Sequence, residues 1–512
     1  MNGAEALVHT LVKAGLTTCF ANPGTSEMHF VAALDRVPGM LCVLGLSEGV
    51  VTGAADGFAR MAQMPAVTLL HCGPGMANGI ANLHNARRAR SAIVNIVGDQ
   101  ATFHQHLDPP LTSDTLGLAQ CFSAWTRSAT SAASVSMDLS VAVQAARTGP
   151  GAIATLIAPA DTCWDEGGVP ADPLPVPPRS AVPTHRIETI AAILRSGEPV
   201  TILIGDAYMH ARLLADAQRV AAASGAKLLT HQFNARVERG RGRAPVERLP
   251  YALDASLKTL AGTRHLVLAG AKAPSAPFAY PGRPGRLEPE GASVHVLARP
   301  DEDVGAALAT LADSLGAPAW KSAPQTPPSE LGTGAISPES VTRSIAAMLP
   351  EGAIVTDESV SFGRSFFNGL SVAAPHDWLQ ITGGAIGSGL PMATGAAVAC
   401  PDRRVVALQA DGSALMTLQA LWTQARENLP VTTVLLSNRK YAILLGELAN
   451  VGANPGRVAL DMLDLGRPDI DWCSLARGFG VESARAETMS EFNDLFAVAT
   501  KRAGPFLIEL MT

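Results

Sequence analysis

The sequence predicts an α/β protein with three doubly wound parallel-sheet domains. Short β-branched, apolar runs alternate with longer segments whose apolar residues recur at helical spacing, which is typical of parallel sheets. Two proline-rich segments without periodicity, 165–183 and 316–334, divide the 512 residues into three blocks. We therefore expect domains at residues 1–165, 185–318 and 337–512.

Each block contains at least four candidate strands. The chain opens with an amphipathic helix, MNGAEALVHTLVKAGL, that lacks the basic and apolar regions of a signal peptide. In the first block we expect strands at 17–21, 40–47, 66–71 and 92–98, with a helix at 49–61. In the middle block we expect strands at 200–205, 227–231, 265–271 and 293–298, and in the last at 353–357, 405–410, 431–437 and 506–510.

Composition excludes several classes of function. The chain is 47% hydrophobic and 16% charged, which is globular, and its net charge of −6 argues against a nucleic-acid partner. No apolar run reaches 18 residues, so no membrane partner is expected. Seven cysteines without CxxC spacing are the reduced core residues expected of a cytoplasmic protein.

Polar residues follow two strands of the last block. Asp411, Gly412 and Ser413 come directly after the strand 405–410, and Asn438 follows the strand 431–437, with a helical segment of residues 413–428 between them. A right-handed βαβ crossover brings these two strand ends to the same edge of a sheet. Carboxylate and carboxamide oxygens suit Mg²⁺ or Ca²⁺, and the N–H groups at Gly412 and Ser413 suit a phosphate. The pattern therefore favours a metal-bridged diphosphate, although Asp411 or Ser413 could instead only cap a helix.

Other strand ends of the first block carry titratable residues. Glu48 opens the predicted helix 49–61, where it is either a functional carboxyl or a charge favoured by the helix dipole. His71 follows the strand 66–71 and could exchange protons near neutral pH, although such histidines are often structural. His104 and His106 follow the fourth strand, in a loop where histidines are usually solvated. The chain contains neither GxxxxGK[ST] nor GxGxxG.

The pattern resembles the thiamine diphosphate-dependent enzymes, whose diphosphate motif is Gly-Asp-Gly followed 24 to 30 residues later by Asn-Asn. This chain has Ala410-Asp411-Gly412 and Ser437-Asn438, so each end keeps its oxygen ligand and loses its outer neighbour. The resemblance is closest to benzoylformate decarboxylases, within the wider group of acetolactate synthases and pyruvate oxidases. It rests also on ANPGTSEMHF, LLHCGPGMANG, ESVSFGRS and GGAIGSGLP, and it covers the first and last blocks almost throughout.

This resemblance implies a role for each site residue. The three blocks would be the pyrimidine-binding, central and diphosphate-binding domains. Mg²⁺ would be bound by Asp411, Asn438 and the Lys440 carbonyl, and the catalytic residues would be Glu48, His71 and Thr25, with Glu48 bonding the aminopyrimidine nitrogen. The cofactor contacts would come from Ser361, Gly384, Ile386, Asp411, Gly412, Ser413, Asn438 and Tyr441.

The implied function is non-oxidative decarboxylation of a 2-oxo acid, with possible carboligation. Benzoylformate decarboxylases have a second histidine from the middle domain, whereas the nearest segment here has Tyr280. Acetolactate synthesis from two pyruvates is the alternative, although those enzymes usually lack a histidine at the His71 position and typically bind a flavin, for which the sequence shows no signal. A homologue that binds the cofactor without turnover is a third reading. The family builds its site between two subunits, which implies a homodimer at minimum and a homotetramer as the expected assembly.

Overall fold

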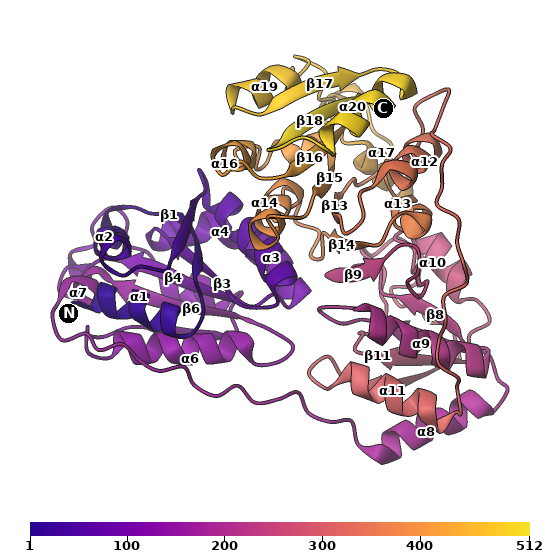
Figure 1. Cartoon of the computed structure of the whole chain (residues 1–512), viewed down its shortest axis with the longest axis horizontal. Helices are drawn as coiled ribbons and strands as arrows, with labels where there is room; N and C mark the ends of the chain where they lie inside the picture. Colours follow the sequence, from indigo (N-terminus) through magenta and orange to yellow (C-terminus); the bar gives the residue numbers. More distant parts are fainter.

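Three separate sheets form the framework of the protein, which is described here by a computed structural model of residues 1–512 (Figure 1). Helices cover both faces of each sheet, which confirms the predicted fold class. Both proline-rich segments lack helices and strands. We propose that these segments bound three domains, at the limits expected from the sequence.

The first sheet has six parallel strands in the order β2-β1-β3-β4-β6-β5. Its strands are β1 (Thr18–Asn22), β2 (Leu41–Leu44), β3 (Ala66–Leu70), β4 (Ile93–Asp99), β5 (Trp125–Ser128) and β6 (Ile153–Pro159). Its helices are α1 (Gly3–Lys13), α2 (Met28–Arg36), α3 (Glu48–Ala62), α4 (Cys72–Ala89), α5 (Thr115–Gln120), α6 (Val135–Arg147) and α7 (Ala160–Trp164), with 3₁₀ turns η1 (Thr25–Glu27) and η2 (Gln105–Leu107).

The middle sheet has five parallel strands in the order β10-β8-β7-β11-β12. Its strands are β7 (Val200–Ile204), β8 (Lys227–Thr230), β10 (Glu247–Arg248), β11 (His265–Ala269) and β12 (Ser293–Ala298). Its helices are α8 (Thr184–Arg195), α9 (Ala211–Ser224), α10 (Leu253–Leu260) and α11 (Val304–Ser314).

The last sheet has seven strands in the order β17-β18-β16-β15-β13-β14-β9. Its strands are β13 (Ile354–Glu358), β14 (His376–Gln380), β15 (Val405–Ala410), β16 (Val431–Ser437), β17 (Glu482–Ala486), β18 (Phe506–Met511) and the antiparallel edge strand β9 (Arg236–Arg239). Its helices are α12 (Pro338–Met348), α13 (Phe366–Gly369), α14 (Gly389–Ala399), α15 (Asp411–Ala414), α16 (Ala420–Arg426), α17 (Ala442–Asn450), α18 (Arg457–Asp461), α19 (Trp472–Gly478) and α20 (Met489–Ala499), with the 3₁₀ turn η3 (Leu370–Val372).

Two features of the last sheet differ from the sequence prediction. β9 comes from the middle block and pairs with β14, and one cluster of 48 buried apolar residues spans the middle and last blocks, so these two blocks share a core. The helix expected over residues 413–428 is also divided: α15 ends at Ala414 and α16 begins only at Ala420. The apolar residues recur at helical spacing there because one side of the segment is buried, and a turn between two short helices can bury the same side chains.

The first and last sheets meet where α3 packs against α14 (Figure 1). Glycines make this contact close, because a Cβ on Gly57 would lie 2.1 Å from the Met392 carbonyl oxygen and one on Gly395 would lie 1.7 Å from that of Ala54. Side-chain size at the contact sets how closely two helices approach. The packing places the beginning of α3, at Glu48, beside the last domain.

Candidate active site

Asp411 and Asn438 lie side by side, because β15 and β16 are parallel neighbours with Ala410 opposite Leu436. Asp411 accepts hydrogen bonds from the backbone N–H groups of Gly412 at 2.8 Å and Arg439 at 2.6 Å, and Asn438 Oδ1 accepts from Lys440 at 3.1 Å. The Lys440 carbonyl accepts no hydrogen bond. Burial raises the pKa of the Asp411 carboxyl although backbone N–H groups oppose the shift, and a bound cation would relieve that desolvation.

The turn after Asp411 is buried and closely packed. A Cβ on Gly412 would lie 2.6 Å from the ring of Tyr441, so only glycine fits there. Ser413 Oγ donates to the Ala410 carbonyl at 3.1 Å and accepts from Gln409 Nε2 at 2.6 Å. Gly412 and Tyr441, two of the predicted contacts, therefore touch each other beside Asp411, and Ser413 follows in the same buried turn.

The glycine-rich loop of residues 383–389 presents two exposed groups. Gly384 has φ +79°, a conformation that favours glycine, and its carbonyl has no hydrogen-bond partner. The Ile386 side chain is 39% exposed although it is apolar. Ser361, after β13, is half-buried and forms no side-chain hydrogen bond.

In the first domain, Glu48 begins α3 and is buried. Asn22 Nδ2 donates to its Oε1 at 3.0 Å and Asn78 Nδ2 donates to its Oε2 at 3.2 Å. Two amides thus fix the orientation of the carboxyl group at the carboxyl end of β1.

His71 precedes α4 and contacts a buried acid. Its Nδ1 lies 2.9 Å from Glu27 Oε2 and 3.2 Å from Ser26 Oγ. In this arrangement Nδ1–H donates to the carboxylate, and Nε2 has no partner. A Cβ on Gly75 would lie 3.1 Å from Glu48 Oε1 and 3.4 Å from His71 Cβ, so Glu48 and His71 are close neighbours.

Four other residues named from the sequence have different surroundings. Thr25 is exposed and its side chain forms no hydrogen bond, although it adjoins the Ser26 and Glu27 pair. His104 directly precedes η2 and His106 lies within it, and neither side chain forms a hydrogen bond. Tyr280, in the segment nearest to that of the second histidine of benzoylformate decarboxylases, donates to Glu447 of α17 at 2.8 Å, and burial together with this bond raises its pKa to about 12.

The candidate residues therefore form two groups, one in the first domain and one in the last. The Glu48 carboxylate forms no hydrogen bond with the last domain, whereas α4 bonds the glycine-rich loop through Asn82, whose Nδ2 lies 3.3 Å from the Gly387 carbonyl oxygen. Glu27, Asn22 and Asn78 are site residues that the sequence did not predict. Glu27 and Asn22 lie in the stretch ANPGTSEMHF and Asn78 lies in LLHCGPGMANG, both of which carry the resemblance, but their contacts with His71 and Glu48 depend on the fold.

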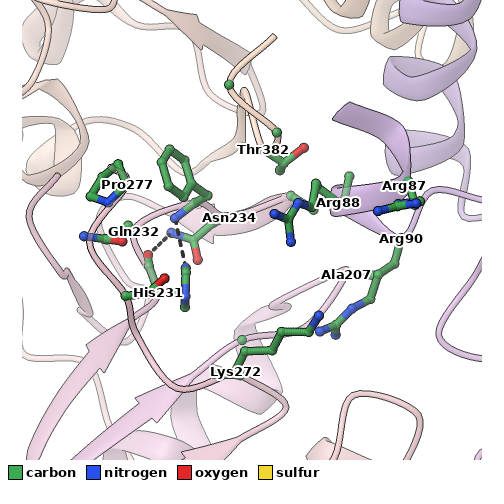
Figure 2. A pocket seen from close by; sticks show the side chains of 18 of the residues that line it. Arg87, Arg88, Arg90, Ala207, His231, Gln232, Asn234, Lys272, Pro277 and Thr382 are labelled. Carbon is green, nitrogen blue, oxygen red and sulfur yellow. Dashed lines mark hydrogen bonds between the residues drawn. The ribbon is translucent and has the colours of Figure 1, made fainter. Parts of the chain in front are cut away.

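A cavity of about 680 Å³ lies at the carboxyl ends of β7, β8 and β11, against the end of α4 (Figure 2). Arg87, Arg88, Arg90 and Lys272 line it, and its acid, Asp206, is paired with Arg179 at 2.8 Å. Burial, together with the nearby cations, lowers the pKa of His231 to about 4. The charge of this cavity suits an anion.

All seven cysteines are free. None of the helices combines the length and the apolar character that crossing a membrane requires.

Both groups of candidate residues lie in or next to segments that match known protein families. Residues 1–122 match the thiamine pyrophosphate enzyme N-terminal TPP binding domain, and residues 362–510 match the corresponding C-terminal TPP binding domain. The chain is 49% identical to a Mycobacterium tuberculosis protein named "Putative acetolactate synthase large subunit IlvX", over 100% of this chain and 99% of that one. It is 30% identical to a benzoylformate decarboxylase of Pseudomonas aeruginosa, over 99% and 98%.

A solved structure is also similar. The thiamine diphosphate-dependent 4-hydroxybenzoylformate decarboxylase of Rhodococcus jostii superposes with a TM-score of 0.85 at 26% identity, over 100% of this chain and 99% of that one. Thiamine pyrophosphate is another name for thiamine diphosphate, so the two family models and the solved structure name the same cofactor. The chain belongs to the family of thiamine diphosphate-dependent enzymes.

Proposed function

We propose that the protein is a thiamine diphosphate- and Mg²⁺-dependent enzyme that decarboxylates a 2-oxo acid without oxidation, with carboligation as a possible second outcome. The observation that carries this proposal is His71, which contacts Glu27 at 2.9 Å and lies beside Glu48. A proton donor at this place serves decarboxylation, because an aldehyde product needs a proton at the carbon that loses CO₂. Similarity to proteins named benzoylformate decarboxylase and 4-hydroxybenzoylformate decarboxylase supports the same class.

The residues of the last domain fit the diphosphate end of the cofactor. The Asp411 and Asn438 side chains and the Lys440 carbonyl supply oxygen ligands of the kind that Mg²⁺ prefers. The absence of a side chain at Gly412 lets the Tyr441 ring pack directly against this turn, beside Asp411. Ser413, Ser361 and Tyr441 would contact the diphosphate.

The remaining groups would act on the rings. Gly384 would accept from the aminopyrimidine and Ile386 would pack between the rings, which agrees with the exposure of both. Glu48 would bond the ring nitrogen, with Asn22 and Asn78 orienting its carboxyl group. When bound, thiamine diphosphate supplies the nucleophilic carbon and the electron sink for decarboxylation.

The first domain would control protons around the substrate. Nδ1 of His71 is occupied by Glu27 and Ser26, so Nε2 is the nitrogen that would give or take a proton. Thr25, exposed at the same turn, would contact the substrate. We also propose that Glu48 and Asp411 of each site come from two chains of a homodimer, which pairs further into a homotetramer.

Acetolactate synthesis from two pyruvates is the second candidate. The relative at 49% identity carries that name, and the cationic cavity of Figure 2 lies at the strand ends of the middle domain, the domain in which the resemblance places a flavin in those enzymes. A homologue without turnover is the third reading. The presence of Glu48 argues against a homologue without turnover, because cofactor binding alone does not need that carboxyl group.

Purified protein assayed with a panel of 2-oxo acids tests these readings together. The assay scores CO₂, aldehyde and acetolactate in the same samples, with the visible spectrum recorded for flavin. If the protein is a decarboxylase, we expect CO₂ and aldehyde in equal amounts and no yellow chromophore. Acetolactate from pyruvate, with bound flavin, would instead support the synthase reading, and no CO₂ from any 2-oxo acid would refute both.

A further inference from the structure

The glycine-rich loop of residues 383–389 is fixed by side chains on both of its halves. In the second half, Glu358 accepts hydrogen bonds from the N–H groups of Gly387 at 2.8 Å and Gly389 at 2.6 Å, and Thr417 Oγ1 donates to the Gly387 carbonyl at 2.8 Å. These partners belong to the last domain. The first half of the loop has no comparable partner there.

Asn85 of α4, in the first domain, binds the first half instead. Its Nδ2 donates to the Ala385 carbonyl at 2.7 Å, and its Oδ1 accepts from the N–H groups of Gly383 at 3.1 Å and Ala385 at 3.2 Å. Asn85 is completely buried. One carboxamide therefore brackets Gly384 from both sides through three hydrogen bonds.

The bracket leaves one carbonyl free. Gly384, between the two bracketed residues, keeps a carbonyl without a partner and is exposed to solvent. A Cβ on Gly383 would lie 2.7 Å from Asn85 Oδ1, so glycine at 383 permits the close approach of α4. The arrangement fixes the direction of the Gly384 carbonyl, the one carbonyl of residues 383–385 that has no partner.

Domain docking alone does not explain this bracket. Arg60 of α3 already joins the first domain to the same segment, because its Nη1 donates to the Gln380 carbonyl at 2.7 Å and its Nη2 to Thr382 Oγ1 at 3.3 Å. Asn85 donates from its amide nitrogen and accepts two bonds at its amide oxygen, and neither an aspartate nor an apolar residue of similar size could do both. The chemistry of Asn85 is thus matched to the backbone that flanks Gly384.

We propose that Asn85 is a positioning residue for cofactor activation, which acts through the loop to aim the Gly384 carbonyl at the aminopyrimidine ring. This inference rests on the proposed function, in which Gly384 contacts that ring. Asn85 would not touch the cofactor itself. Replacement of Asn85 should therefore impair activation of the ring more than binding of the diphosphate, because the diphosphate contacts at Asp411 and Asn438 lie elsewhere.

The test compares Asn85→Ala and Asn85→Asp with a matched control, Asn95→Ala. Asn95 of β4 is equally buried and forms comparable bonds, to Thr155 Oγ1 at 2.9 Å and from Thr68 Oγ1 at 2.7 Å, but none to the loop. Asn85→Asp keeps the size and the acceptor and removes the donor, so it reports on the bracket if the alanine variant folds poorly.

Three quantities are measured on protein reconstituted with thiamine diphosphate and Mg²⁺: cofactor Kd, thermal midpoint, and the exchange rate of the thiazolium C2 proton with deuterium. We expect exchange to slow by roughly 100-fold in both Asn85 variants, the loss that a displacement of about 1 Å can cause. Kd should change little. The control should lose stability but exchange at the wild-type rate.

Wild-type exchange in both folded Asn85 variants, or an equal loss in Asn95→Ala, would overturn the proposal. The measurement needs no substrate, so its outcome is separate from that of the proposed reaction. If wild-type protein exchanges the C2 proton but decarboxylates no 2-oxo acid, the proposed reaction fails and the role of Asn85 is still decided.

Discussion

Replacing Glu27 by glutamine should cut turnover through His71. The Glu27 carboxylate is buried and accepts from Gly24 N at 2.7 Å, Ser26 Oγ at 2.6 Å and His71 Nδ1 at 2.9 Å. A hydrogen bond to a charged group contributes about 1.5–3 kcal/mol, and each ~1.4 kcal/mol corresponds to a tenfold change in rate. If the lost bond is the one that orients His71, kcat should fall roughly 10- to 100-fold.

Steady-state kinetics with the 2-oxo acid found in the panel measure this effect. KM should change little, because buried Glu27 offers no surface to a substrate. The control is Glu302→Gln in the middle domain, a buried carboxylate that accepts from Arg186 Nη1 and Arg299 N, each at 2.6 Å. That variant should lose stability and keep its kcat. Unchanged kcat in Glu27→Gln, or an equal fall in both variants, would refute the orienting role.

Three further outcomes are expected. Glu48→Gln should retain thiamine diphosphate in equilibrium dialysis yet lose most turnover, and undiminished turnover would contradict its role. Asp411→Ala should abolish Mg²⁺-dependent cofactor retention, so normal retention after dialysis would refute the proposed metal site. His376→Asn should reduce the acid sensitivity of folding. Burial lowers the pKa of His376 to about 4, below the ~6.5 of an exposed histidine, so its contribution is constant above pH ~6.5 and is lost as pH falls toward 4, by about 3 kcal/mol. The thermal midpoint should therefore fall less between pH 7 and pH 4.5 in the variant than in the wild type. An equal fall in both proteins would show that His376 does not cause the acid sensitivity.

The strands that the sequence predicts share a local signature. β15 and β16 are runs of β-branched and apolar residues, and their ends place Asp411 and Asn438 together by the geometry of parallel pairing alone. β9, with the sequence RVER, and β5, with WTRS, lack such runs, and they form because a neighbouring strand offers them hydrogen bonds. Short polar edge strands depend on this tertiary partner.

The candidate site divides in the same way. By itself, the sequence determined the alternation of strands and helices, and so the strand ends at which Asp411, Asn438, Glu48 and His71 stand, because that information is local. Only the tertiary structure decided that Glu27 contacts His71 and that Asn85 brackets Gly384. The latter two residues are 299 positions apart in the chain (384 − 85), and their contact depends on how two domains pack. Contacts of this kind leave no periodicity in the sequence, since each partner is chosen by the shape and the free hydrogen-bonding groups of a distant surface.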